Sequence, residues 1–302
     1  MIRPSMTPPQ VEMPRDPRMK HWLEERARLE DELGERITLD SLTGADGSDL
    51  RDDAGVGAGW LIAQRLKGHR HSIDDVLTAW YALRTSPPVA EHLDLGTGIG
   101  TVGLLTLWGM GAEARLTCIE AQELSFRLLR SNIHANGLQA RVDAMHGDLR
   151  ELALDRKFPL ITGSPPYFPE GSGVIPQDSQ KAHARFELRG DVADYAASAA
   201  RHLAPGGWFV LCFPTPQKQR ALDGIGAAGL KTVKLRDVIP RETLGALFTL
   251  FACRHAEEAG GDPHEEAPLT VRGKCGRLTA EMASVRRGFG FSDGEAHGGH
   301  GA

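Results

Sequence analysis

The chain has 302 residues, of which 41% are hydrophobic and 25% charged, and its formal net charge is −5. This size and composition suffice for a full hydrophobic core, in one large α/β domain with extensions or in two small domains. The slight negative charge argues against a strongly basic nucleic-acid binder but leaves room for local basic patches. No apolar run reaches transmembrane length, and residues 1–9 lack the apolar region of a signal peptide. We therefore expect a cytoplasmic protein with no membrane partner.

The cysteines and histidines form no metal-ligand pattern. Cys118, Cys212 and Cys253 lie inside apolar runs, far apart, and no C-x-x-C pair occurs. Such spacing is typical of buried thiols in a reducing compartment rather than of disulfides or a metal site. We expect no metal ion, and the sequence does not indicate an oligomeric state.

Residues 1–64 are expected to form an N-terminal extension with one helix. Residues 1–17 are rich in proline, which predicts disorder. Residues 18–35 are charged and helix-favouring, with a thin apolar stripe. Residues 41–59 contain many glycines and aspartates, which indicates a loop or an irregular hairpin.

Residues 65–255 alternate apolar strands with helical segments, a pattern that predicts a doubly wound α/β domain. Before the first strand, Gly68–Asp75 leads into a helix, and we expect this segment to reach over a ligand site. The alternative is that Ser72 or Asp74 simply caps the helix. Strands are expected near residues 89–95, 115–120, 142–145, 158–162, 208–213, 231–238 and 246–253, the last two as a closing antiparallel pair.

A glycine-rich turn follows the first strand of this domain. Asp94 lies near the end of this strand, and Gly96, Gly98 and Gly100 follow at every second position, with Thr97 between the first two. Glycine permits a sharp turn and the close approach of a ligand to the N–H groups at a helix start. The spacing D-x-G-x-G-x-G differs from the dinucleotide pattern G-x-G-x-x-G. It predicts a ligand-binding loop, with an ordinary strand–helix turn as the alternative.

An acidic residue, Glu120, ends the next strand. In a doubly wound sheet this position lies beside the glycine loop, where a carboxylate accepts hydrogen bonds from both hydroxyls of a ribose. A solvated glutamate at a strand end is the alternative.

The tetrapeptide Ser164-Pro165-Pro166-Tyr167 follows the strand near 158–162. The prolines fix the backbone and give its carbonyls set directions. The Ser164 side chain and the Pro165 carbonyl then suit the two hydrogens of a planar NH2 group, with Tyr167 stacked on the attached ring. Such contacts aim the nitrogen lone pair without a strong base, so positioning is the main contribution. The alternative is a turn that ends the strand.

These motifs resemble those of the class I S-adenosylmethionine (SAM) amino-methyltransferases with an [N/D/S]-P-P-[Y/F] tetrapeptide. Gly68–Asp75 and the overall spacing are most similar to the bacterial tRNA (adenine-N6)-methyltransferases that modify an anticodon-loop adenine of a valine tRNA. The resemblance covers about residues 65–255. It implies a Rossmann-like, seven-stranded, mostly parallel sheet with helices on both faces and an antiparallel last strand. It also implies SAM as cofactor and RNA, with tRNA favoured, as substrate.

The resemblance also implies roles for individual residues. Asp148 would accept a hydrogen bond from the adenine of the cofactor, or it caps the next turn. That family usually has asparagine where this chain has Ser164, and serine is familiar from cytosine-N4 enzymes, so the target base stays open. The residues with a catalytic role are Ser164, Pro165 and Tyr167. Those with a cofactor role are Asp94, Gly96, Thr97, Gly98, Gly100, Glu120 and Asp148.

Two stretches beyond the tetrapeptide carry further hypotheses. Residues 169–189 form a long loop that grips the substrate or covers the site, or else a mobile insertion. Residues 256–302 are expected to form a C-terminal extension: an acidic linker to residue 268, then a basic stretch with a small hairpin and a helix. This stretch contacts RNA phosphates or is a solvated face. The candidate substrate-binding residues are Pro166, Phe168, Lys181 and Arg185.

Three functions are consistent with these features. The first is a SAM-dependent N-methyltransferase acting on an exocyclic amine, adenine N6 in tRNA or in another structured RNA. The second is a protein glutamine N5-methyltransferase, although residues 1–60 are short for the helical substrate domain of that class. The third is a non-catalytic SAM-fold protein that binds RNA or a partner, for which the tetrapeptide has no evident use.

Overall fold

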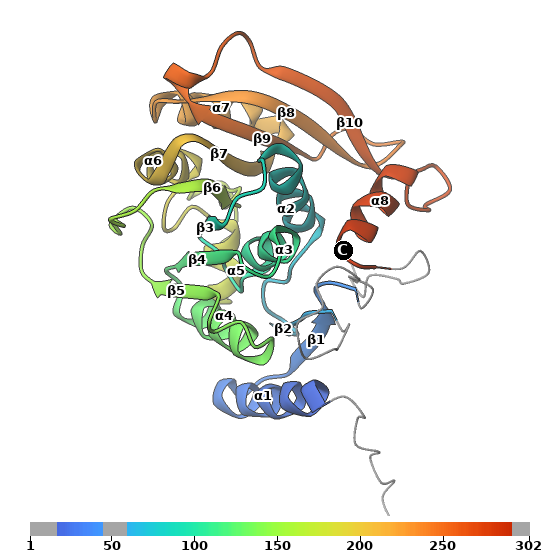
Figure 1. Ribbon diagram of the computed structural model, residues 1–302. Coiled ribbons are helices and arrows are strands. Elements are labelled where there is room, and N and C mark those ends of the chain that lie inside the picture. The colour runs from blue at the N-terminus through green and yellow to red at the C-terminus, as the bar shows by residue number, and fades with distance from the viewer. Residues whose placement is uncertain (1–16, 45–58, 292–302) are drawn as a thin grey trace, which may run out of the picture.

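An eight-stranded sheet runs through the centre of the protein, with helices on both of its faces (Figure 1). The structure is a computed structural model that describes residues 17–44 and 59–291. The strand order is β10-β8-β9-β7-β6-β3-β4-β5, and β9 runs antiparallel to both of its neighbours. The strands of this sheet are β3 (Glu91–Leu95), β4 (Arg115–Glu120), β5 (Val142–His146), β6 (Phe158–Gly163), β7 (Leu203–Pro214), β8 (Leu230–Arg241), β9 (Phe248–His255) and β10 (His264–Arg272).

Two apolar clusters fill the space between the sheet and its helices. Neighbouring strand residues such as Leu160 and Ile161 belong to different clusters, because successive side chains of a strand point to opposite faces. The first cluster includes side chains of α1 (Pro17–Leu33), α2 (Ile73–Thr85), α3 (Thr101–Met110), α4 (Glu123–Ala135) and α8 (Ala280–Gly288). The second includes side chains of α6 (Val192–His202) and α7 (Lys218–Ala227).

The remaining elements are short. A two-stranded antiparallel sheet joins β1 (Ile37–Ser41) to β2 (Leu61–Arg65). The helix α5 (Ser179–Arg185) lies between β6 and α6, and two 3-10 turns occur, η1 (Thr215–Gln217) and η2 (Ala256–Glu258). In residues 17–44 and 59–291, no helix is long and apolar enough to cross a membrane. The same residues contain no group of three His, Cys, Asp or Glu side chains that could hold a metal ion.

The predicted fold class is confirmed. Seven of the strands have the predicted arrangement: six run parallel, β9 runs antiparallel to them, and β8 and β9 form the predicted antiparallel pair. The expected count of seven is too low, because β10 adds a parallel strand beside β8. The expectation of an acidic linker to residue 268 is therefore wrong for residues 264–268. Leu269 and Val271 are buried while Glu265 is exposed, and Glu266 pairs with Arg84 of α2, so this stretch is an outer strand packed on the protein rather than a linker.

The helix predicted at residues 18–35 is confirmed as α1, and Trp22 and Leu29 of its apolar stripe are buried. The hairpin β1–β2 was not predicted, because strands of five residues give little periodicity. The predicted disorder of residues 1–17, apart from Pro17, and most of the loop at 41–59 lie outside the described residues. The division into residues 1–64, 65–255 and 256–302 stays a prediction.

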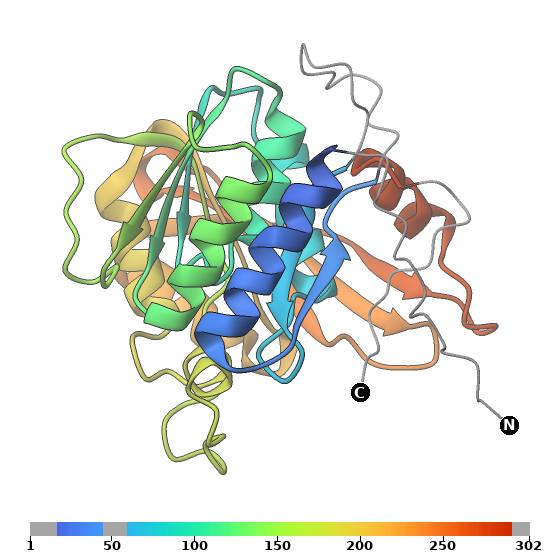
Figure 2. The same ribbon diagram turned by 90° about the horizontal axis from the view of Figure 1, so that it is seen from below.

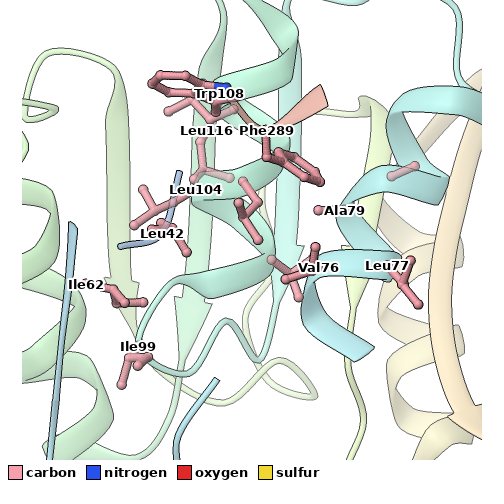
Figure 3. Close-up of a cluster of buried hydrophobic side chains, with 14 of the residues drawn as sticks. Leu42, Ile62, Val76, Leu77, Ala79, Ile99, Leu104, Trp108, Leu116 and Phe289 are labelled. Carbon is pink, nitrogen blue, oxygen red and sulfur yellow. The ribbon is translucent and has the colours of Figure 1, made fainter. Parts of the chain in front are cut away.

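Both extensions pack into the same core as the main sheet. Figure 3 shows Leu42, next to β1, and Phe289, after α8, in one cluster with Ile99 and Leu104 around the start of α3. The exposed fractions of these four side chains are 2%, 2%, 7% and 0%. The extensions therefore stabilise the part of the sheet that carries the glycine loop.

A buried asparagine joins the hairpin to the glycine loop. The Asn132 side chain on α4 accepts a hydrogen bond from the Ala63 N–H at 2.7 Å and donates one to the Ile99 carbonyl at 2.9 Å. Asn132 is fully buried, so water cannot replace these partners. Both backbone groups depend on this one amide.

We expect Asn132→Ala to lower the free energy of unfolding by about 2–4 kcal/mol, because two buried backbone groups lose their partner. Urea unfolding measures the change. Asn136→Ala is the matched control: Asn136 makes the same pair of bonds to Leu61, but it is partly exposed, so water can replace it. Equal losses in the two variants would contradict the burial argument.

Candidate active site

A cavity of about 350 Å³ opens at the carboxyl ends of the parallel strands β3, β4 and β6. This volume lies within the range of small-ligand pockets, about 300–1,000 Å³. The glycine loop, the end of β4, the tetrapeptide and the segment before α2 all line it. The predicted site residues found in its wall are Asp94, Gly96, Thr97, Gly98, Glu120, Asp148, Ser164, Pro165, Pro166, Tyr167, Phe168 and Arg185. Gly100 and Lys181 are not among the lining residues.

The glycine loop has a backbone that other residues rarely adopt. Gly96, Gly98 and Gly100 have φ angles of 58°, 60° and 100°. A Cβ on Gly96 would lie 1.9 Å from the Tyr195 hydroxyl, whereas a Cβ on Gly98 would meet no atom within 4 Å. Gly96 is therefore required by packing as well as by conformation, and Gly98 leaves open space. Gly100 forms the N-cap of α3.

Asp94 holds the loop to the neighbouring strand. Its two carboxylate oxygens accept hydrogen bonds from the Thr97 and Thr162 hydroxyls, each at 2.5 Å. The Gly103 N–H donates to it as well, and burial raises the pKa of Asp94 to about 6. The Thr162 hydroxyl also lies 2.7 Å from Nε2 of the buried His92. Asp94 thus directs its oxygens to partners within the protein.

Glu120 is anchored in a different way. Its carboxylate accepts hydrogen bonds from the Gly98 N–H at 2.8 Å and from the Gln122 N–H at 2.7 Å. The side chain is nearly buried, and burial raises its pKa, while the two backbone bonds oppose this shift. Each carboxylate oxygen has a second lone pair. Glu120 therefore stands in the cavity wall in a fixed position with acceptor capacity left for ribose hydroxyls.

Asp148 lies in the cavity wall next to Arg150. Its carboxylate forms an ion pair with the Arg150 guanidinium at 2.7 Å and accepts the Arg150 N–H at 2.9 Å. Arg150 lowers the pKa of Asp148, so this side chain stays ionised. The alternative role predicted for Asp148, holding the turn that follows it, is present in the structure, and the cavity contact leaves the cofactor role as a proposal.

The tetrapeptide lines the same cavity as Ser125 of α4. The Tyr167 hydroxyl donates a hydrogen bond to Asp74 at 2.6 Å, and its ring packs edge-on against Phe213 with centroids 5.9 Å apart. Burial, followed by the Asp74 charge, raises the pKa of Tyr167, so the hydroxyl stays protonated. The Ser164 hydroxyl lies 3.5 Å from Cys212 Sγ, a weak partner. The Ser164 oxygen is thus available to a stronger donor.

The segment before α2 contributes side chains to the cavity, in the place that the sequence predicted for it. Ser72 is the N-cap of α2, as the alternative interpretation expected, and its N–H donates to Asp75 at 3.1 Å. Asp74 and Asp75 both line the cavity. Burial and the Asp74 charge raise the pKa of Asp75 well above its ordinary range. One segment therefore both caps a helix and lines the cavity.

Residues 169–189 contain a helix that the sequence did not predict. Arg65, at the end of β2, forms an ion pair with Asp178 at 2.6 Å and donates to the Gln180 side chain at 3.1 Å. Gln180 is buried, and its amide donates to the Ser125 hydroxyl at 3.3 Å. These bonds attach α5 to β2 and α4 beside the cavity.

Sequence reasoning missed several residues of the cavity wall. Tyr195 of α6 lies against Gly96, and Gln122, Ser125 and Gln180 line the same cavity. No motif marks them, because they come from helices whose cavity-facing side depends on the packing of α4, α5 and α6. Gln122 alone had a signal, since it follows Glu120 by two residues and caps α4.

The fold and the cavity together define a class of protein. A mostly parallel sheet whose antiparallel strand β9 lies between β7 and β8, with a glycine loop after β3 and an anchored acid at the end of β4, is the arrangement of a class I methyltransferase. Residues 80–222 match the family model "Methyltransferase small domain". The chain is therefore a class I, SAM-dependent methyltransferase.

Curated relatives have modest similarity over much of the chain. A tRNA1(Val) (adenine(37)-N6)-methyltransferase of Shewanella sp. (strain W3-18-1) is 29% identical over 71% of this chain and 88% of the relative. The enzyme of the same name from Actinobacillus pleuropneumoniae serotype 7 (strain AP76) is 23% identical over 66% of this chain and 81% of the relative. A predicted O-methyltransferase from Agrobacterium tumefaciens has the same fold, with a TM-score of 0.55, 18% identity, and coverage of 72% of this chain and 96% of that one.

The raised pKa of Asp94 predicts a pH effect on stability. Because the pKa rises from 3.8 to about 6 on folding, the native protein binds more protons than the unfolded chain between these values. The contribution of Asp94 to the free energy of unfolding therefore falls as the pH rises through this window, by on the order of 3 kcal/mol. Asp94→Asn does not titrate. Urea unfolding should show the stability of wild type relative to this variant falling between pH 4 and pH 7, and a constant difference would contradict the assignment.

Proposed function

We propose that this methyltransferase transfers a methyl group to the exocyclic amine of a base in tRNA, with adenine N6 as the acceptor. The observation that carries the proposal is that Ser164–Tyr167 and Glu120 line one cavity. An acid suited to a ribose and a tetrapeptide suited to an amine thus face the same space. The names of the relatives, which specify an adenine of a tRNA, support the same acceptor. An enzyme with this substrate would work in the cytoplasm.

Several residues fit SAM as the methyl donor. Glu120, fixed by two backbone N–H groups, would accept hydrogen bonds from the ribose hydroxyls. Asp148, ionised beside Arg150, would accept from the adenine amino group. The open space at Gly98 would let the ligand lie directly on the loop backbone. Asp94, Thr97 and Gly100 would act by holding this loop in shape.

The tetrapeptide would position the acceptor nitrogen. SAM supplies an electrophilic sulfonium methyl when it is bound. The Ser164 hydroxyl and the Pro165 carbonyl would each accept a hydrogen bond from one N–H group of the acceptor amine. These two hydrogen bonds would direct the lone pair of the nitrogen into the cavity. Tyr167, held by Asp74, would stack on the attached ring. The transferred methyl displaces one proton from the nitrogen, and water can accept this proton after transfer.

The cavity entrance suits a base that has left its stack. Phe168 is 40% exposed, and the Arg185 guanidinium lies over its ring at 5.8 Å. An aromatic ring and a cation at the entrance are typical of sites that bind single-stranded bases. Pro166 would support the stacked ring from the cavity wall. Lys181, beside the cavity on α5, would contact phosphate rather than the base.

Transfer of a labelled methyl group from SAM tests the acceptor class. The purified protein is incubated with tRNA, ribosomal RNA and cell protein, each prepared from a strain that lacks the gene. Label in tRNA is the expected result. Label only in protein would replace the proposal with glutamine methylation, and SAM binding without any transfer would favour a non-catalytic role.

Glu120→Gln and Ser164→Ala should separate binding from chemistry. We expect Glu120→Gln to raise the Kd for SAM at least tenfold, because the ribose loses a charged acceptor. Ser164→Ala should leave this Kd within about twofold and lower kcat roughly tenfold or more, because it affects only the acceptor amine. Calorimetry measures SAM binding and single-turnover assays measure transfer. Normal SAM binding in Glu120→Gln, or normal turnover in Ser164→Ala, would remove the corresponding role.

Asp74 and Tyr167 should act as a pair. Tyr167→Phe and Asp74→Asn each disturb the hydrogen bond that fixes the Tyr167 ring, so each should lower kcat/KM for tRNA about tenfold. The double variant should have a kcat/KM no lower than that of the less active single variant, because both changes act on one interaction. Losses that multiply would show that Asp74 acts independently of Tyr167.

A further inference from the structure

The outermost strand, β10, places several cationic side chains at the same end of the parallel strands as the active site. Strands β8 and β10 run parallel to β7, so their carboxyl ends lie at the edge where the tetrapeptide follows β6. In Figure 2, both strands (orange) lead towards the hairpin that precedes α8 (red). The residues that we call the basic edge are the exposed Arg241, Arg272, Lys274 and Arg277.

A continuous set of contacts links the basic edge to the tetrapeptide. Gln217 donates a hydrogen bond to the Tyr167 carbonyl at 2.8 Å. Two residues earlier, the Thr215 N–H donates to the Leu247 carbonyl at 3.1 Å in the turn after β8. In the same turn, the Glu242 N–H donates to the Arg272 carbonyl of β10 at 2.9 Å. Backbone and side-chain hydrogen bonds therefore fix the position of the basic edge relative to the active site.

Four cations and one carboxylate give this surface a net positive charge, and the Arg272 guanidinium donates a hydrogen bond to an uncharged group, the Gly276 carbonyl, at 2.8 Å. Lys274 has 75% of its side chain exposed, and its ion pair with Glu242 is long, at 3.8 Å. Glu242 is the one carboxylate in residues 241–247 and 272–277. Leu244 and Leu247 of the same turn are 57% and 55% exposed. Cations around exposed apolar side chains, in a chain with a net charge of −5, fit a polyanion with exposed sugars or bases.

We infer that the basic edge binds the phosphate backbone of the RNA substrate at a distance from the methylated base. This inference rests on the proposed function and extends it, because it assigns β10 and the following hairpin a role in holding the RNA. The cavity would receive one base, and the basic edge would hold the backbone of the adjoining stem. Such contacts fix register and orientation without reading sequence.

Charge reversal at two of these residues tests the inference. Lys274→Glu combined with Arg277→Glu should raise the Kd for total tRNA on the order of tenfold at 0.1 M salt, because two phosphate contacts are lost. The slope of log Kd against log salt concentration should become shallower by about 1.5–2 for the same reason. Glu242→Gln should act in the opposite direction and tighten tRNA binding. Fluorescence anisotropy with labelled tRNA measures all three quantities.

A second pair of substitutions provides the matched control. Arg115→Glu combined with Lys231→Glu makes the same change in net charge at the first residue of β4 and beside the first residue of β8, on the opposite edge of the sheet. Its tRNA binding should stay close to that of wild type. The Kd for SAM and the thermal midpoint should be unchanged in every variant. Charge reversal could disturb the turn between Arg272 and Leu278 itself. The neutral double variant, Lys274→Gln with Arg277→Gln, tests for this, and its increase in log Kd for tRNA should be about half that of the charge-reversed protein.

The outcomes separate this inference from the proposed function. Equal weakening in the two charge-reversed proteins would mean that net charge, not the basic edge, governs binding, and would overturn the inference. Unchanged tRNA affinity and salt slope, in a protein that still methylates tRNA, would also overturn it while leaving the proposed function intact. A wild-type protein that transfers no methyl group to tRNA would overturn both.

Discussion

The active site depends on one buried carboxylate. Asp94 is the penultimate residue of β3 and accepts hydrogen bonds from Thr97 in the glycine loop and from Thr162 near the end of β6. Two residues after Thr162 the chain reaches Ser164 and the tetrapeptide. One side chain therefore fixes the proposed cofactor loop and the proposed amine site relative to each other. The raised pKa of Asp94 is a consequence of placing this acid out of contact with water. Methyl transfer between two bound groups needs such fixed geometry, because positioning supplies most of the catalysis.

The elements around this centre limit how the site can move. Asp74, before the sheet begins, holds the Tyr167 hydroxyl, and Arg65, at the end of the N-terminal hairpin, holds α5 through Asp178 and Gln180. At the other end of the sheet, β10 and α8 pack into the same core and extend the active-site edge. The extensions on either side of the predicted methyltransferase region thus support the site through the shared core, whereas the residues that line the cavity lie between His69 and Tyr195.

The sequence predicted the features that depend on local chemistry. Glycines that need positive φ, an acid at a strand end and two adjacent prolines each restrict the backbone by themselves, so the loop at Gly96–Gly100 and the tetrapeptide could be placed from the residues alone. Features that depend on packing were missed. Tyr195 reaches the cavity only because α6 packs on β3 and β6. Residues 264–268 of β10 were mistaken for a linker because few residues of this strand are buried. The hydrogen bond between Asp74 and Tyr167 joins residues 93 positions apart, and no local pattern indicates it.

The central claim is that the tetrapeptide presents an exocyclic amine, not a hydroxyl or a carbon, to the methyl donor. The most direct test is mass spectrometry of nucleosides from tRNA methylated by the purified enzyme, with the attachment atom and the position in the tRNA both determined. The account predicts N6-methyladenosine at a single unpaired base, and N4-methylcytidine there would keep the amine chemistry while correcting the base. A methyl group on a ribose oxygen or on a ring carbon would contradict it.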